Sequence, residues 1–125
     1  MSTPLLQIDA FTTEPFRGNP AAVCILGQGH NKPDGWMQSL AAEMNLSETA
    51  FVAPHENPLK RAWRLRWFTP AVEVNLCGHA TLATAHALWT EGYLRPNEEA
   101  RFHTKSGVLT CTRAINGRIT MNFPA

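Results

Sequence analysis

The sequence predicts an α+β domain in which mostly antiparallel strands are wrapped around one buried helix, with a second helix outside. Three observations support this fold class. An alternating segment at residues 72–76 leads straight into a helical segment, residues 80–88, that is apolar almost all round. Residues 35–44 carry apolar side chains at helical spacing, and an Asn-Gly pair at 116–117 marks a hairpin.

The first two strands are predicted at residues 5–11 and 21–26, paired across a polar turn. Asn19 lies in that turn, directly before a proline, so its backbone is biased to an extended form and its side chain is free to point outward. Asn19 is therefore a candidate ligand contact, and a plain turn residue is the alternative interpretation.

The next helix is predicted at residues 35–44, with Asp34 as a candidate N-cap and Asn45 as a left-handed terminator. Five apolar side chains share one stripe of this helix: Trp36, Met37, Leu40, Ala41 and Met44. Such a stripe predicts a helix that lies against the outside of the sheet.

Glu48 stands immediately before an apolar strand predicted at residues 49–53. A carboxyl group at a strand end beside a partly dry hollow is suited to move a proton to and from carbon near neutral pH. The alternative is a solvated glutamate at a helix–strand junction, which the residues alone favour.

The remaining strands are read from alternation and turn residues. In the strand predicted at residues 61–68, Arg64 and Arg66 are expected to face solvent, while three aromatic and aliphatic residues face the core. These three are Trp63, Leu65 and Trp67. Gly92 suits the left-handed end of the buried helix, and residues 95–100 are predicted to form a charged loop.

The clearest strand pairing joins residues 108–114 to residues 118–123 across the Asn-Gly turn. Alternation places Ile119, Met121 and Phe123 on its inward face. The elements predicted from the sequence are six or seven strands and two helices.

The start of the buried helix, at Gly78, is a candidate anion site. The first N–H groups of a helix have no partner within it and carry partial positive charge. Because Gly78 has no Cβ, a carboxylate or developing enolate could approach Gly78, His79 and Ala80 closely. The alternative is that Gly78 only makes the turn and His79 is a polar residue near the surface.

Composition excludes several classes of protein. The 125 residues suit one domain, and 11 Lys and Arg against 10 Asp and Glu create no field that would attract nucleic acid or an anionic membrane. No apolar run has transmembrane length, and the start has no charged leader. The three cysteines form neither a disulfide framework nor a CxxC pair, which predicts a reduced, cytoplasmic protein.

No metal or cofactor is expected from the sequence. His79 and His86 would lie about 10 Å apart along a helix, too far to share one metal ion. The glycine-rich motifs that bind dinucleotides and phosphates are absent.

Four short blocks together resemble the phenazine-biosynthesis PhzF-like isomerase family. They are Phe-Arg-Gly-Asn-Pro-Ala-Ala-Val at 16–23, Asn-Leu-Ser-Glu-Thr-Ala-Phe at 45–51, Arg-Trp-Phe-Thr-Pro at 66–70 and Leu-Cys-Gly-His-Ala-Thr at 76–81. The ending Met-Asn-Phe-Pro-Ala at 121–125 is also similar, so the resemblance runs from about residue 5 to the last residue.

The resemblance implies a diaminopimelate-epimerase-like fold: two similar domains, each a barrel-like antiparallel sheet around a central helix, with the active site between them. It also implies cofactor-independent proton transfer at carbon, with Glu48 as the general acid/base. Gly78 and His79 match the substrate-contacting pair at the helix start. Two further positions, Asn19 and Ser47, would line the same site, and Cys77 stands where related epimerases and racemases keep a proton-carrying cysteine.

Two departures from the family pattern bear on function. Asn75 stands where many members have Asp, which is expected to alter a hydrogen bond and not the chemistry. Residues 1–125 cover only the first half of the family's length, a single N-terminal-type domain. Such a half would expose its site and a sheet edge, so we expect a homodimer in which a second copy replaces the missing domain.

Two function classes therefore stay open. The first is an isomerase or epimerase that acts on a small carboxylate. The second is a non-catalytic small-molecule binding or interaction module that retains half of such a site. A third interpretation is that the chain is a piece of a longer protein.

Overall fold

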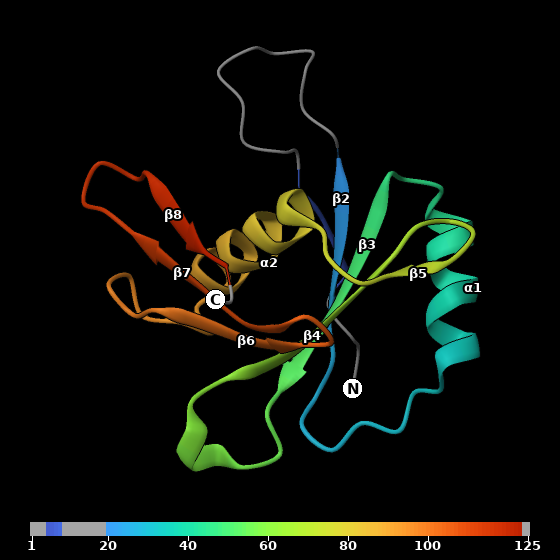
Figure 1. Ribbon diagram of the computed structural model, residues 1–125, viewed down its shortest axis with the longest axis horizontal. Helices are drawn as coiled ribbons and strands as arrows, with labels where there is room; N and C mark the ends of the chain where they lie inside the picture. Colours follow the sequence, from blue (N-terminus) through green and yellow to red (C-terminus); the bar gives the residue numbers. More distant parts are fainter. Residues whose placement is uncertain (1–4, 9–19, 124–125) are drawn as a thin grey trace.

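The computed structural model describes residues 5–8 and 20–123, which form one curved mixed sheet and two α-helices (Figure 1). In chain order the elements are β1 Leu5–Ile8, β2 Ala21–Ile25, α1 Asp34–Met44, β3 Glu48–Pro54, the 3₁₀-helix η1 Pro58–Lys60, β4 Trp63–Phe68, β5 Glu73–Val74, α2 Gly78–Thr90, β6 Ala100–Thr104, β7 Gly107–Arg113 and β8 Ile119–Asn122. Within these described ranges, no helix is long and apolar enough to cross a membrane.

The strands follow the order β1-β2-β3-β4-β6-β7-β8, and β5 pairs with β4 outside this path. Most pairs are antiparallel, as predicted, but β2 with β3 and β4 with β6 are parallel. The parallel register sets Ala21 opposite Glu48. The first residues of β2 and β3 therefore lie side by side, where both strands begin. We call this end of the two strands the rim of the sheet.

Helix α2 is enclosed by the sheet, which confirms the central prediction (Figure 1). Eight of its residues are buried: Ala80, Thr81, Ala83, Thr84, Ala85, Ala87, Leu88 and Trp89. Small side chains let the strands approach this helix from several sides, because alanine adds little radius to the helical backbone. The helix ends at Thr90, and Gly92 follows in the predicted left-handed conformation, with φ +83°.

Helix α1 lies on the outer face of the sheet, as its apolar stripe predicted (Figure 1). Met37 and Ala41 are buried there in a second apolar cluster with Phe51 and Phe68. Asn45 ends the helix in the left-handed conformation, with φ 50°.

The predicted cap of α1 is wrong. Pro33 occupies the N-cap position, and no side chain caps the helix there. Asp34 is instead the first helical residue, and its carboxylate pairs with Arg66 at 2.8 Å. The carboxylate that was expected to cap α1 is thus engaged by Arg66 of β4, so Asp34 anchors α1 to β4.

Three strand predictions need correction. The described residues contain eight strands, because residues 100–104, for which no strand was predicted, form β6 directly after the predicted charged loop. Strand β4 begins at Trp63, since Arg61 adopts a left-handed conformation after η1, with φ 47°. Phe123 lies beyond the end of β8 and is 54% exposed, so it does not face the core.

Other features of these strands agree with the sequence pattern. The side chains of Trp63, Leu65 and Trp67 are buried on the inner face of β4. Arg64 is exposed as expected, whereas Arg66 is largely buried in ion pairs. The Asn-Gly hairpin joins β7 to β8, with Gly117 at φ +88°.

Candidate functional site

The candidate site lies where the starts of β2, β3 and α2 meet. Glu48 is the first residue of β3 and is half-buried, and Ser47 before it is exposed. Asn45 ends α1 in its left-handed conformation, so the chain turns and enters β3 within three residues. This short connection places the Glu48 carboxyl group at the rim of the sheet.

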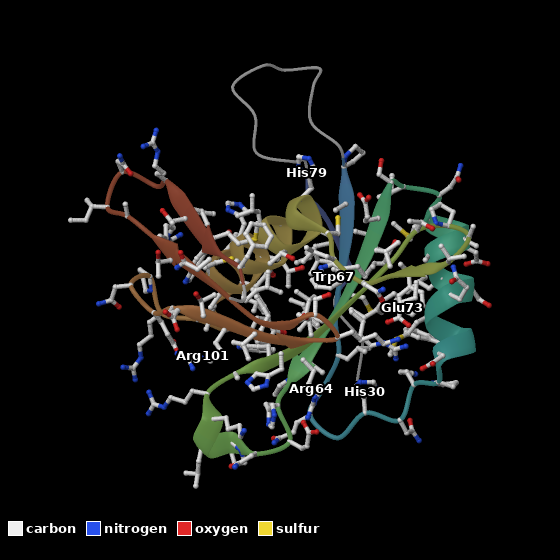
Figure 2. The ribbon with its side chains drawn as sticks, in the orientation of Figure 1. His30, Arg64, Trp67, Glu73, His79 and Arg101 are labelled. Carbon is white, nitrogen blue, oxygen red and sulfur yellow. The ribbon has the colours of Figure 1, made fainter. Side chains whose placement is uncertain are left out.

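The start of α2 reaches the same rim. Cys77 occupies the N-cap position in an extended conformation, and its side chain makes no capping hydrogen bond. Gly78 is half-buried, and a Cβ built there would lie 3.4 Å from the Met121 Cε atom. His79 is exposed, and Figure 2 shows it at this end of the helix, near the first residues of β2.

Glu48 and Cys77 lie close enough at this rim for the carboxylate to influence the thiol. The pKa of the Cys77 thiol is raised, first by burial and then by the charge and hydrogen bonding of the Glu48 carboxylate. The N–H groups of Ala80 and His79 face the sulfur and oppose this rise. The thiol therefore holds its proton beside a carboxylate, at the electropositive end of a helix.

The other two cysteines are of a different kind. Burial raises the pKa of Cys24 to about 11 and that of Cys111 to about 12. Both side chains are almost completely buried, whereas Cys77 is half-exposed. Cys77 is therefore the cysteine that a ligand can reach, because reactivity requires access to the sulfur.

A chain of ionic contacts holds the segment that leads into α2. Arg66 donates to both carboxylate oxygens of Glu73, at 2.8 and 2.9 Å, and Lys105 donates to the same carboxylate at 2.8 Å. The Ser106 hydroxyl donates to the Asn75 carbonyl at 2.6 Å. These contacts from β4 and from the β6–β7 turn position the residues just before Cys77.

The first turn of α2 is also tied to the core. The Thr81 hydroxyl donates to the Cys77 carbonyl at 2.7 Å and accepts the indole N–H of Trp67 at 3.1 Å. Both side chains are buried. The helix start is thus fixed from within by β4, while its outer end remains accessible at His79.

The structure brings together most of the residues singled out in the sequence. Glu48, Cys77 and the backbone of His79 and Ala80 form one group, and Gly78 lies within it. Ser47 adjoins Glu48 in the chain. Asn19 lies outside the described residues.

Sequence reasoning missed the four residues that hold the segment before the helix start: Arg66, Glu73, Lys105 and Ser106. The only sequence signal was Arg66 itself, a cation in a strand otherwise made of apolar residues and one further arginine. Its acidic partners, Glu73 and Asp34, lie 7 and 32 residues away, so local spacing did not pair them.

The arrangement offers three chemical capacities: a carboxylate that accepts a proton, a thiol that carries one, and helix N–H groups that stabilise negative charge. Within residues 5–8 and 20–123, no group of three His, Cys, Asp or Glu side chains is placed to hold a metal ion.

Comparison with known proteins gives the family. The family model described as phenazine biosynthesis-like protein matches residues 8–125. A Halalkalibacterium halodurans protein named an uncharacterized isomerase is 49% identical over 125 residues, which are 100% of this chain and 44% of that protein. The human phenazine biosynthesis-like domain-containing protein is 48% identical over 129 residues, covering 99% of this chain and 43% of its own length.

Solved structures agree with this result. A PhzF-family phenazine biosynthesis protein from Enterococcus faecalis has a TM-score of 0.78 and 45% identity, and the match covers 92% of this chain and 42% of that one. A hydroxyproline epimerase from Agrobacterium vitis has a TM-score of 0.68 at 15% identity, over 95% of this chain and 40% of that one, which shows the fold alone. The predicted diaminopimelate-epimerase-like fold is thereby confirmed.

This chain spans less than half the length of the curated relatives that it matches. The match nevertheless extends over nearly all of its residues, and the relatives include a named isomerase. The chain belongs to the phenazine biosynthesis-like, PhzF-type family, which includes relatives named as isomerases.

Proposed function

We propose that this domain carries half of an active site for cofactor-independent proton transfer at carbon in a small carboxylate substrate. The observation that carries this proposal is the meeting of Glu48, the Cys77 thiol and the N–H groups at the start of α2. Glu48 would remove a proton from carbon and return it at a second position or face. The helix N–H groups and His79 would stabilise the enolate-like charge that develops between these two steps.

The substrate contacts follow from the same arrangement. Gly78 and Ala80 would present backbone N–H groups to the substrate carboxylate, with Ser47 at the border of the site. The family resemblance proposes Asn19 as a further substrate contact. Cys77 would contact the substrate beside Glu48, and its proton makes it a candidate second proton carrier. Its raised pKa keeps the thiol protonated at neutral pH, which suits a donor.

Solvent deuterium exchange tests the proposal. The protein is incubated in D₂O with a panel of cyclic and amino-acid carboxylates, and deuterium incorporation at carbon is measured by NMR or mass spectrometry. Glu48→Gln should abolish exchange while substrate binding persists. Glu43→Gln, an exposed glutamate of α1, is the matched control and should exchange like wild type.

The alternative function is a non-catalytic module that binds a small carboxylate. The observation that favours it is the span of the chain, since its matched relatives are more than twice as long. The same panel separates the two functions. Saturable binding by wild type without any deuterium incorporation would support the module and contradict the proton-transfer proposal.

We further propose that the site is completed by a second copy of the chain, in a homodimer. Among the described strands, β1 and β8 end the sheet order and pair on one side only. Leu5 and Phe123 leave 40% and 54% of their surface exposed near these edges. Edge strands with exposed apolar side chains favour association.

Light scattering after size-exclusion chromatography, at low micromolar concentration, measures the mass directly. A dimer would have twice the 13.9 kDa of the chain, and a stable monomer would contradict this proposal. We also propose that the protein works in the cytoplasm, because its three cysteines are free thiols.

A further inference from the structure

A cavity lies far from the candidate site, between η1 and the segment that follows α2. Its volume is about 330 Å³, and its walls include Arg61, Trp63, Tyr93, Arg95 and Glu98. Helix α2 has 13 residues, which correspond to a length of about 20 Å and separate its start from this segment. Figure 1 shows η1, in green at the bottom, on the opposite side of the molecule from the start of α2. We call this space the η1 cavity.

Two cationic side chains on the walls of the η1 cavity have no side-chain partner among the residues that the structure describes. Within the described residues, neither the Arg61 nor the Arg95 guanidinium forms a hydrogen bond or an ion pair. Nearby arginines behave differently, since Arg64 pairs with Glu56 and Arg101 pairs with Glu99. A cavity with two unpaired guanidinium groups is suited to an anion, because the planar group donates to both oxygens of a carboxylate.

The acidic residue on this wall, Glu98, forms no ion pair with Arg61 or Arg95 among the described residues. The Glu98 carboxylate accepts the backbone N–H of Arg95 at 3.0 Å, and its carbonyl accepts the indole N–H of Trp89 at 2.9 Å. Glu98 therefore stabilises the loop that forms one wall. The negative end of α2 is covered too, because the Leu88 carbonyl accepts the N–H groups of Tyr93 and Leu94 at 2.9 and 3.1 Å.

The cavity wall also carries two aromatic side chains, of which Tyr93 is the more exposed. The rings of Trp63 and Tyr93 are 5.9 Å apart and nearly perpendicular, and Tyr93 leaves 45% of its surface exposed. A planar ring of a ligand can stack on such a pair. A volume of about 330 Å³ lies at the small end of the range for ligand pockets, roughly 300–1,000 Å³.

The loop that carries Arg61 is held in place before any ligand arrives. Asn57 caps η1 through a hydrogen bond from the Leu59 N–H at 3.0 Å, and its own N–H donates to His55 Nδ1 at 3.0 Å. Arg61 follows with φ 47° and ψ 49°, a conformation that glycine adopts more easily than arginine. The chain thus keeps a cation at a position where its backbone favours glycine.

From these contacts we infer that the η1 cavity binds a small monocarboxylate attached to a flat aromatic ring. Arg61 and Arg95 contact the carboxylate, and Trp63 and Tyr93 contact the ring. The inference does not depend on the proposed proton transfer, since it involves other residues and the opposite end of α2.

Titration of the ¹⁵N-labelled full chain with benzoate, followed by amide NMR shifts, tests this inference. Saturable shifts are expected at residues 55–63 and 93–98 and not at residues 77–80. Acetate, which lacks the ring, and benzamide, which lacks the charge, should each bind roughly tenfold more weakly than benzoate.

Three variants make the test specific. Arg61→Gly removes the guanidinium and relaxes the left-handed backbone, so the protein should fold as well as wild type and bind benzoate roughly tenfold more weakly. Arg95→Gln should weaken binding to a similar extent. Arg101→Gln, the matched control on β6, should bind like wild type.

Four results would overturn the inference. They are the absence of saturable shifts, shifts centred on residues 77–80, equal affinity for benzoate and benzamide, and unchanged affinity in a folded Arg61→Gly protein.

Discussion

The contact between Trp67 and Thr81 supports a quantitative prediction, because it joins the enclosed helix to the sheet and fixes the first turn of α2. The Trp67 indole N–H donates to the Thr81 hydroxyl at 3.1 Å, and both side chains are at most 1% exposed. Thr81→Val keeps the shape of the side chain but leaves this N–H without an acceptor. A buried donor without a partner costs about 1–3 kcal/mol.

Two smaller effects modify this estimate. The Cys77 carbonyl loses the Thr81 hydroxyl but keeps the Thr81 N–H at 3.1 Å, so its loss is small. The methyl group that replaces the hydroxyl is easier to bury and offsets part of the penalty. We therefore expect Thr81→Val to lower the free energy of unfolding by about 1–2 kcal/mol, which corresponds to roughly 3–10 °C in Tm.

Thr84→Val is the matched control on the same helix. Thr84 is equally buried, but its hydroxyl only donates to the Ala80 carbonyl, at 2.6 Å. The helix itself supplies that carbonyl with an N–H donor, so Thr84→Val leaves no group unpaired. Its cost should be below about 0.5 kcal/mol, and a small stabilisation is equally consistent with the argument.

Urea denaturation followed by circular dichroism measures both variants, and a double-mutant cycle isolates the contact. In a Trp67→Phe background the indole donor is gone, so Thr81→Val should cost about 1 kcal/mol less than in wild type. Equal losses for Thr81→Val and Thr84→Val, or a cycle without coupling, would refute the reasoning.

Two further predictions concern the Cys77 thiol and the Glu73 carboxylate. Iodoacetamide should alkylate Cys77 and spare the buried Cys24 and Cys111. Glu48→Gln should speed the alkylation of Cys77 several-fold near neutral pH, because removal of the carboxylate lowers the pKa of the thiol. Mass spectrometry at several pH values measures the rates, and a rate unchanged by Glu48→Gln would mean that the two groups do not interact. Arg66, and to a smaller extent Lys105, hold the pKa of Glu73 in the folded protein below its ordinary value of 4.5. The ionised Glu73 carboxylate therefore stabilises the folded state above pH 4.5, and this stabilisation is lost as the pH falls through the folded-state pKa. Glu73→Gln should therefore cost about 1–2 kcal/mol at pH 7 and progressively less under acid conditions, as read from urea midpoints, and a cost independent of pH would argue against the ion pair as its source.

Features that depend on local pattern could be predicted from the sequence. The nearly continuous apolar run in residues 80–88 had to be enclosed, and α2 is enclosed. The Asn-Gly pair specified its hairpin, and Asn45 ended α1, because few other residues adopt left-handed backbone conformations. In each case the signal lies within a few residues of its consequence.

Features that depend on distant partners could not be predicted in this way. Strand β6 carries exposed Arg101 beside Glu98 and Glu99, so its composition resembles a loop, and only its pairing with β4 and β7 makes it a strand. Arg66 was expected in solvent because its partner Asp34 is 32 residues away. For the candidate site, the sequence motifs pointed to Glu48 and Cys77. The rim on which Glu48 lies is defined by the parallel pairing of β2 with β3, which local sequence does not predict.

The enclosed helix explains why the site lies where it does. A helix surrounded by strands along its length can meet a ligand only at an end, and its N-terminal end carries unpaired N–H groups. At α2 the N-cap residue is Cys77, whose side chain does not cap these groups, and the internal hydroxyl of Thr81 contacts a carbonyl instead. A carboxylate at this end is favoured by the helix dipole, and the Glu48 side chain lies beside Cys77 there. Under the proposed function, this position would set Glu48 near the N–H groups that stabilise the enolate, which is the proximity that proton transfer at carbon requires.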